Sequence, residues 1–186
     1  MPRVIYNTAT TLDGFIATAD HSLQWLFDVP ESGEAESGFP AFLEGIGALV
    51  LGSSTYEWVY REQRLAEQPE TWHAYYGDRP TWVFTTRALP VAAPTIRFVR
   101  GAVVDSWAEI SASAGERDVW VVGGGDLAGQ FADADLLDEI RVSVAPATLG
   151  SGMPLLPRTL GADRLSLVSV GRSGAFAELR YAVSGP

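Results

Sequence analysis

The sequence predicts an α/β domain that ends in antiparallel strands. Short apolar runs alternate with stretches of helical pattern as far as about residue 132. Beyond that point the pattern is purely β, with a strand near 138–145 and a hairpin whose arms are near 164–171 and 175–183. The chain of 186 residues has no internal repeat and no convincing linker. We therefore expect residues 1–186 to form a single domain.

The first strand is expected at residues 3–9, and Thr11–Gly14 carries a turn signal directly after it. Residues 17–38 are polar, acidic and interrupted by glycine. Such a composition is typical of a mobile loop, and this one would carry Trp25.

A short helix near 39–45 leads into an apolar strand at 48–51. Ser54 and Glu57 then have the spacing of a capping box, which predicts that a helix begins there. Residues 62–80 are rich in Gln, Glu, Trp and Tyr without a clear period, so we expect them to be irregular.

Strands are expected at 80–86 and 95–99. Ser106 and Glu109 repeat the capping-box spacing and predict a helix that ends near residue 114. The apolar run at 118–122 predicts a buried strand that leads directly into three glycines and a short helix.

The composition excludes several kinds of chemistry. The chain has no Cys, so disulfide scaffolds, thiol catalysis and thiolate metal sites are excluded. Its two histidines, His21 and His73, are too few and too far apart to suggest a metal site. All 13 basic residues are Arg, which excludes Schiff-base chemistry and a P-loop lysine. The net charge of −10 argues against nucleic acid and anionic membranes as partners.

The N-terminus has none of the charged start, long apolar run and cleavage site of a signal peptide. No apolar run approaches the roughly 18 residues of a membrane span. Together with the absence of Cys, these features predict a cytoplasmic protein without membrane partners.

Glycine or hydroxyl residues follow three of the expected strands, at Gly123–Gly125, Gly52–Thr55 and Thr85–Arg87. Junctions from strand to helix are natural anion sites, because a helix N-terminus presents unpaired N–H groups and the positive end of a dipole. A phosphorylated ligand would therefore be bound by backbone N–H groups, hydroxyls and a few arginines.

The run Gly123–Gly125 with Ala128 matches the pattern G-x-G-x-x-A of dinucleotide-binding proteins. A tight turn that requires positive φ is the alternative interpretation. The run lies two-thirds along the chain and is followed by antiparallel strands, whereas the Rossmann motif belongs to the first βαβ unit. We therefore expect nucleotide binding in a fold other than the Rossmann fold.

The remaining candidates are weaker. Helix capping explains the presence of Ser54 as well as ligand binding does. A lone surface arginine such as Arg87 is usually just solvated. A hydrolase is disfavoured because no G-x-S-x-G sequence exists and a triad would need His21 or His73. Four aromatic side chains could form a pocket for a flat ring, or instead a core or dimer interface. These residues are Trp25, Trp72, Tyr75 and Tyr76.

In their order along the chain, five segments resemble the dihydrofolate-reductase-like superfamily, and most closely the stand-alone relatives of the riboflavin-biosynthesis reductase domain. The segments are Thr11–Ala17, Leu51–Glu57, Val83–Arg87, Val121–Gly125 and Val144–Gly150, followed by a hairpin that ends in Leu179–Tyr181. The resemblance implies a three-layer α/β sandwich with a mostly parallel central sheet and an antiparallel C-terminal hairpin. It also implies NADPH as the hydride donor, and a homodimer.

The resemblance assigns cofactor contacts to matching positions of this chain. Gly123, Gly124, Gly125, Asp126 and Leu127 would approach the pyrophosphate, and the first two glycines would be joined by a cis peptide. The other phosphate contacts would come from Gly52, Ser53, Ser54 and Thr55. Thr85, Thr86 and Arg87 would surround the adenosine, and Ala9 and Ile16 would lie against the nicotinamide.

Two departures from the family pattern matter. Ser53 stands where the family usually has an arginine, so NADH remains possible as the cofactor. The Asp-Pro and arginine motif for the substrate phosphate of the riboflavin enzyme is also absent, since residues 58–64 read Trp-Val-Tyr-Arg-Glu-Gln-Arg.

We therefore expect an NAD(P)H-dependent reductase that transfers hydride to a small heterocyclic substrate, such as 5-amino-6-(5-phosphoribosylamino)uracil. Substrate contacts are expected from Asp13 and Trp25, and Glu36 is the candidate proton donor. One alternative is a dimeric nucleotide- or ligand-binding protein that has lost turnover, and another is a true dihydrofolate reductase.

Overall fold

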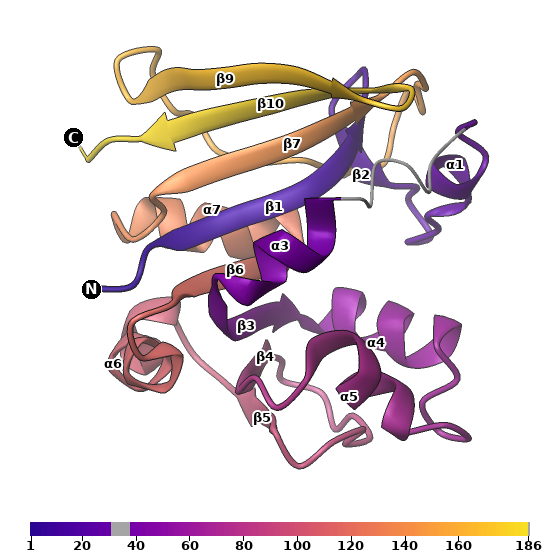
Figure 1. Ribbon diagram of the computed structural model, residues 1–186, viewed down its shortest axis with the longest axis vertical. Helices are drawn as coiled ribbons and strands as arrows, with labels where there is room; N and C mark the ends of the chain where they lie inside the picture. The colour runs from indigo at the N-terminus through magenta and orange to yellow at the C-terminus, as the bar shows by residue number, and fades with distance from the viewer. Residues whose placement is uncertain (31–37, 186) are drawn as a thin grey trace.

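A computed structural model describes residues 1–30 and 38–185 of the chain, so Glu36 lies outside the described residues. The strands alternate with helices up to β7 and then end in a hairpin (Figure 1). The helices are α1 (Gln24–Phe27), α3 (Phe39–Glu44), α4 (Ser53–Glu62), α5 (Glu70–Tyr76), α6 (Val103–Ala114) and α7 (Gly125–Asp133). The strands are β1 (Val4–Thr11), β2 (Phe15–Ala17), β3 (Ile46–Gly52), β4 (Thr81–Phe84), β5 (Ile96–Val99), β6 (Asp118–Gly123), β7 (Glu139–Ala145), β8 (Met153–Pro154), β9 (Leu165–Ser173) and β10 (Phe176–Val183).

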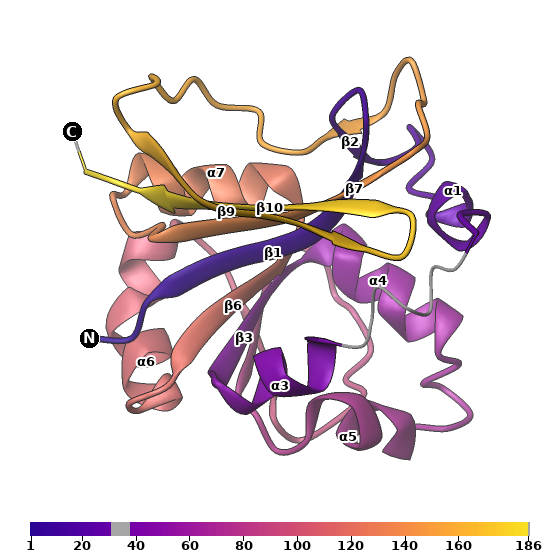
Figure 2. The ribbon, with the colours of Figure 1, turned by 45° about the horizontal axis from the view of Figure 1, so that its top comes forward.

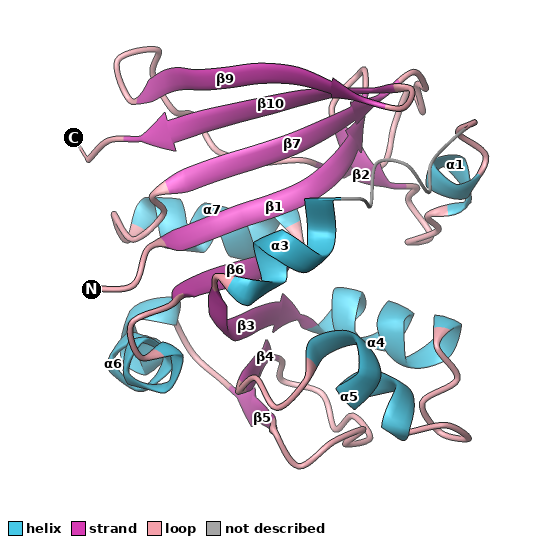
Figure 3. Cartoon of the chain, viewed as in Figure 1, coloured by secondary structure: helices cyan, strands magenta, loops and turns pink. Residues whose placement is uncertain are grey.

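Eight strands form one sheet in the order β5-β4-β3-β6-β1-β7-β10-β9. The strands from β5 to β7 pair in parallel, whereas β10 pairs antiparallel with both β7 and β9. β2 and β8 form a separate two-stranded ladder, and β2 lies beside the end of β1 (Figure 3). The predicted mostly parallel sheet with an antiparallel C-terminal hairpin is therefore confirmed.

Helices cover both faces of the parallel part of the sheet (Figure 2). On one face α6 and α7 pack against alternate residues of the central strands, such as Tyr6, Val50 and Val121. On the other face α3, α4 and α5 enclose an aromatic core that includes Tyr56 and Trp72. Burial on both faces explains why the parallel strands read as nearly continuous apolar runs.

The expected irregular stretch at 62–80 contains helix α5. Trp72 and Tyr76 lie one turn apart on its buried side, with ring centroids 4.6 Å apart. The helix is only seven residues long, so its apolar stripe spans a single turn. That is too short for the helical period to be recognised from the sequence.

Both capping-box predictions placed the helix start too late. Helix α4 starts after Gly52, and helix α6 starts after Ala102. In α6 the carboxylate of Asp105 accepts the backbone N–H of Ala102 at 3.2 Å, which stabilises the earlier start. The serines of both predicted boxes lie inside the helices and do not cap them.

Trp25 was expected in a mobile loop, but it lies on helix α1 and only 8% of its surface is exposed. It packs with Val29, Ala145 and Phe176 in a small core beside the C-terminal hairpin. Together with the burial of Trp72 and Tyr76, this position assigns three of the four candidate pocket aromatics to the protein interior; Tyr75 is exposed.

Candidate active site

A cavity of about 400 Å³ lies where the central parallel strands end. Thr8 of β1, Gly52 at the end of β3 and Gly123 at the end of β6 contribute to its wall. Such clefts at the carboxyl ends of parallel strands are the usual ligand sites of open α/β sheets. The remaining lining residues are Ile16, Ala17, His21, Leu23, Ser53, Ser54, Thr55, Trp58, Phe84, Val122, Gly124, Gly125, Asp126, Leu127, Gln130 and Met153.

The structure brings together ten of the residues that the sequence nominated: Ile16, Gly52, Ser53, Ser54, Thr55, Gly123, Gly124, Gly125, Asp126 and Leu127. Two of the three predicted junctions therefore meet in one cavity. The third junction, at Thr85–Arg87, follows Phe84, which lines the cavity, but its own residues do not. Ala9, Asp13 and Trp25 are also outside the lining.

The three glycines of the run have different surroundings. A Cβ atom on Gly123 would lie 2.9 Å from Oγ1 of Thr55, and one on Gly125 would lie 2.3 Å from the carbonyl oxygen of Pro154. A Cβ on Gly124 would meet only Cδ1 of Ile16, at 3.9 Å. Gly123 and Gly125 are therefore required for close packing, whereas Gly124 leaves space open in the cavity.

None of these glycines has a positive φ, so the alternative interpretation of the run as a positive-φ turn is wrong. The peptide bond between Gly123 and Gly124 is cis, as the resemblance implied. Gly124 has extended backbone angles and directly precedes α7. The glycines thus bring the backbone to the cavity wall and begin the helix there.

Two helices begin at the cavity, α4 at Ser53 and α7 at Gly125. Neither N-terminus receives a hydrogen bond from a capping side chain. Their first-turn N–H groups are therefore not satisfied within the helices, and the positive ends of both helix dipoles lie at one site. This arrangement can bind an anionic group such as a pyrophosphate without a basic side chain.

Asp126 is the one acidic residue that lines the cavity among the described residues. Its carboxylate accepts hydrogen bonds from Gln130 and from Arg158, each at 3.0 Å. The hydrogen bond from Gln130, followed by the bond and charge of Arg158, lowers the pKa of Asp126 despite partial burial. Arg158 also binds Asp133 at 2.7 Å, so it ties the two ends of α7 together outside the cavity.

Arg87 is not a free cation. Its guanidinium binds the carboxylate of Glu57 through two contacts, at 3.0 Å and 2.5 Å. This ion pair connects the segment after β4 to helix α4, whose first turn lines the cavity. A phosphate that approached Arg87 would have to compete with Glu57.

Asp13 connects two loops. Its carboxylate accepts hydrogen bonds from the hydroxyl of Thr11 at 2.6 Å and from the N–H groups of Leu149 and Gly150 at 3.1 Å and 2.7 Å. These bonds, led by that from Thr11, lower the pKa of the carboxyl group. The contacts indicate that Asp13 positions the loops after β1 and β7, and they leave its substrate contact a prediction.

Sequence reasoning did not nominate nine residues of the cavity lining: Thr8, Ala17, His21, Leu23, Trp58, Phe84, Val122, Gln130 and Met153. His21 was considered only as a member of a hydrolase triad. The signal that could have identified it is its place five residues after Ile16, which the resemblance had already assigned to the cofactor site.

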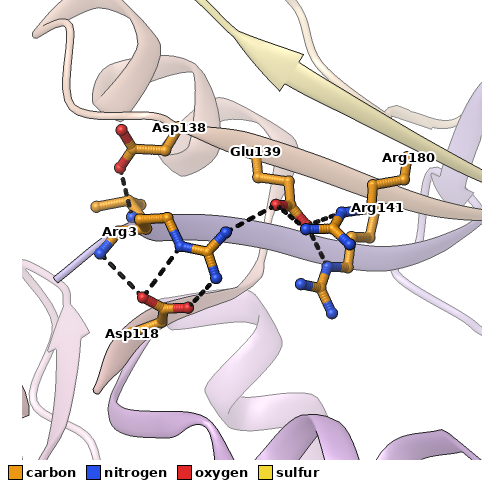
Figure 4. Close-up of polar contacts among 7 residues, drawn as sticks. Arg3, Asp118, Asp138, Glu139, Arg141 and Arg180 are labelled. Carbon is orange, nitrogen blue, oxygen red and sulfur yellow. Dashed lines mark hydrogen bonds and ion pairs between the residues drawn. The ribbon is translucent and has the colours of Figure 1, made fainter. Parts of the chain in front are cut away.

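The amino ends of the same strands carry a cluster of opposite charges (Figure 4). Glu139, whose side chain is 6% exposed, binds Arg3 at 3.3 Å, Arg180 at 2.7 Å and also Arg141. Arg3 further binds Asp118 at 2.5 Å. Burial raises the pKa of Glu139, but the hydrogen bonds and charges of Arg180 and Arg141 outweigh it and lower the pKa overall.

The sheet order, the antiparallel hairpin and the glycine junction define a domain of the dihydrofolate-reductase-like fold. The sequence matches the RibD C-terminal domain family over residues 2–175, and the chain belongs to this family. The resemblance stated from the sequence is therefore confirmed.

Relatives of several kinds are similar to the chain. The uncharacterized protein YwjB of Bacillus subtilis (strain 168) is 28% identical over 179 residues, which cover 96% of this chain and 97% of YwjB. The riboflavin biosynthesis protein RibD of Corynebacterium ammoniagenes is 32% identical over 167 residues, which are 86% of this chain and 47% of RibD. The chain thus spans about half of that protein.

Solved structures support the fold. A Shewanella sp. PV-4 protein provisionally assigned to riboflavin biosynthesis has a TM-score of 0.76 at 24% identity, with both chains fully covered. A pyrimidine reductase-like protein from Corynebacterium diphtheriae has a TM-score of 0.68 at 12% identity, covering 100% of this chain and 93% of the other. No helix in the described part of the chain is long and apolar enough to cross a membrane.

Proposed function

We propose that the protein is an NAD(P)H-dependent reductase that acts in the cytoplasm on a small heterocyclic substrate with a C=O or C=N bond. The observation that carries the proposal is the cavity at the carboxyl ends of the strands, where two uncapped helix N-termini meet beside Gly124. Membership of the RibD C-terminal domain family supports the same conclusion.

The cavity wall fits a dinucleotide in two respects. The missing side chain of Gly124 leaves room at the wall, and the first turns of α4 and α7 offer N–H groups to a pyrophosphate. Ser53, Ser54 and Thr55 add hydroxyl groups beside them. When bound, the cofactor would supply the hydride.

The apolar side chains of Ile16, Leu23 and Met153 line the same cavity and would exclude water from the reacting atoms. Trp58 would offer a flat surface to a heterocyclic ring. In such a site catalysis is largely a matter of orientation, because the hydride donor and acceptor must be held in contact.

The substrate that we propose is 5-amino-6-(5-phosphoribosylamino)uracil or a close relative. A Thermotoga maritima protein described as a reductase of this compound has a TM-score of 0.63 to the chain at 17% identity, covering 98% of this chain and 57% of the other. Dihydrofolate is the rival substrate, and its reduction would identify a true dihydrofolate reductase.

The first test is binding of NADPH and NADH, measured by quenching of the fluorescence of the six tryptophans. Saturable binding of at least one cofactor is expected, and its absence at millimolar concentration would contradict the proposal. Oxidation of NADPH is then followed with the ribosylaminouracil phosphate and with dihydrofolate in parallel.

One observation favours a binding protein without turnover as the second candidate. The cavity has Ser53 at the position where the family usually has an arginine, and its described lining contains no arginine at all. Cofactor binding without oxidation in the presence of either substrate would favour this candidate over the reductase.

We also propose that the chain forms a homodimer through strand β9. This strand lies at the edge of the sheet, and it exposes Leu167, Val168 and Val170. An edge strand can pair with its copy about a two-fold axis, which would bring these side chains beside their counterparts across the seam. Sedimentation should show a dimer that Val170→Lys dissociates, whereas Val104→Lys, at an exposed valine of α6, should leave it intact.

A further inference from the structure

Among the described residues, two titratable side chains line the cavity, those of His21 and Asp126. Asp126 already accepts hydrogen bonds from Gln130 and Arg158, and its pKa is lowered, so it is a poor proton donor. Within residues 1–30 and 38–185 the imidazole of His21 forms no hydrogen bond, and its electrostatic partner is the adjacent Asp20. Its ring nitrogens are available to a ligand in the cavity.

The backbone holds His21 in an unusual conformation. Its φ is 63°, in the left-handed region that few residues other than glycine adopt. A closed turn fixes this geometry. The N–H of Thr18 donates to the carbonyl oxygen of Ser22 at 3.1 Å, and the carbonyl oxygen of Thr18 accepts the N–H of His21 at 2.9 Å. The hydroxyl of Thr18 also accepts the N–H of Ser22 at 2.9 Å. Outliers of this kind cluster at functional sites.

The turn follows β2 without a gap, and Ile16 and Ala17 of β2 line the same cavity. β2 is itself anchored by the ladder with β8, whose Met153 also lines the cavity. The imidazole is thus presented to the cavity by a short, hydrogen-bonded segment on the side that the resemblance assigns to the nicotinamide.

We propose that His21 is the general acid of the reduction. The inference rests on the proposed function. As hydride reaches the carbon of the C=O or C=N bond, the π-electron pair moves to the heteroatom, which takes the proton of the imidazolium. The substrate gains two electrons and the cofactor loses two, and the imidazole recovers a proton from water at its exposed side.

Several charged groups surround this position. Asp20 is the neighbouring residue of the turn, and its carboxylate accepts a hydrogen bond from Thr18. Together with Arg61 and Glu62 of α4, Asp20 lines an adjoining cavity that shares Leu23 and Trp58 with the first. Asp126 of α7 faces the same cavity as His21. Arg158 pairs with Asp126, so the charged groups around His21 are three carboxylates and two arginines.

Two histidines in the chain make a direct test possible. In two-bond ¹H–¹⁵N spectra, the imidazole signals of His21 should shift when NADP⁺ saturates the protein. His73 provides the internal control, since it lies on α5 beside Asp78 and outside the cavity. If the His21 signals stay unchanged in the saturated protein, the imidazole is not at the site and the inference is wrong.

The second test is the pH dependence of turnover. His21→Asn retains a residue that tolerates positive φ but removes the titrating group. It should lower kcat about 100-fold, flatten the fall of kcat with rising pH, and leave the Kd for NADPH unchanged. His73→Gln should keep both the rate and the pH profile. A normal profile in His21→Asn would overturn the inference.

The two proposals fail in different ways. If neither cofactor binds, the proposed function is wrong and His21 loses its role with it. If NADP⁺ shifts the His21 signals but neither substrate is reduced, the second candidate function is favoured and the role of His21 as a general acid falls with the reductase. If turnover persists in His21→Asn with its pH dependence intact, the reductase stands and another group supplies the proton.

Discussion

The two ends of the central sheet use polar groups in opposite ways. At the amino ends, the charges of Arg3 and Glu139 are satisfied by other side chains of the protein (Figure 4). At the carboxyl ends, the helices α4 and α7 begin without capping side chains, and their N–H groups are left at the wall of a cavity. The first arrangement stabilises the fold, and the second is available to a ligand.

The difference shows that an accumulation of charged residues is not what marks the candidate site. The charge cluster at the amino ends is paired internally, whereas Asp126 is the one charged side chain of the described cavity lining apart from His21. For a chain without lysine and with a net charge of −10, backbone donors attract a phosphate without adding basic residues. Variants at each end should therefore affect different properties.

The largest effect is expected for Gly124→Val, which adds a side chain where the cavity wall is open. The backbone angles of Gly124 are accessible to valine, so the fold should persist. Affinity for NADPH should fall at least about 100-fold, or about 2.7 kcal/mol, in a fluorescence titration. Gly171→Val, on the exposed strand β9, is the control with unchanged affinity. Full affinity in Gly124→Val would place the phosphates elsewhere.

Glu139→Gln should produce the second largest effect, on stability rather than on binding. The substitution leaves three arginines near a neutral amide in place of a buried carboxylate. We expect the free energy of unfolding to fall by about 2 kcal/mol and Tm by about 6 °C, as measured by calorimetry. The Kd for NADPH should not change; a change would mean that the two ends are coupled.

Glu57→Gln should increase the preference for NADPH over NADH, because it releases Arg87 from its ion pair. The freed guanidinium would be available to the 2′-phosphate that distinguishes NADPH from NADH. The ratio of the two affinities should shift toward NADPH about fivefold, or about 1 kcal/mol. Arg87→Gln in the same titration is the matched variant, and it should remove the gain when the two substitutions are combined.

The smallest effect is expected on how the free energy of unfolding decreases at acidic pH. The folded-state pKa of Glu139 is lowered, so its contribution is present above the unfolded-state pKa and is lost as pH falls through the folded value. As pH falls below about 4.3, the stability of Glu139→Gln should therefore decrease less steeply than that of the wild-type protein. Parallel slopes in urea titrations over this range would contradict the assignment.

Much of this organisation could be predicted because it depends on local sequence. The apolar runs predicted the buried strands, and the glycine run with the serine-rich segment 52–55 predicted two of the cavity's walls. The ion pair between Glu57 and Arg87 could not be predicted, because it joins residues 30 positions apart through side-chain geometry. Helix α5 was missed since one turn carries too little periodicity.

The three glycines show the limit of a motif most clearly. All three are glycine, but they have different roles. Gly123 and Gly125 allow close packing against Thr55 and Pro154, whereas a side chain on Gly124 would extend into open space in the cavity. His21 illustrates the converse case. The hydrogen bonds and positive φ of its turn have no recognisable sequence signature, so only its place shortly after Ile16 could have indicated it.

The position of β1 has a consequence for how the chain folds during synthesis. β1 is made first, yet its neighbours in the sheet are β6 and β7, so Ile5 pairs beside Trp120 and Glu139. Until residue 145 has been synthesised, β1 lacks at least one of the two strands with which it pairs. Contacts this distant in sequence slow folding, so the central sheet should form only after the second half of the chain has been synthesised.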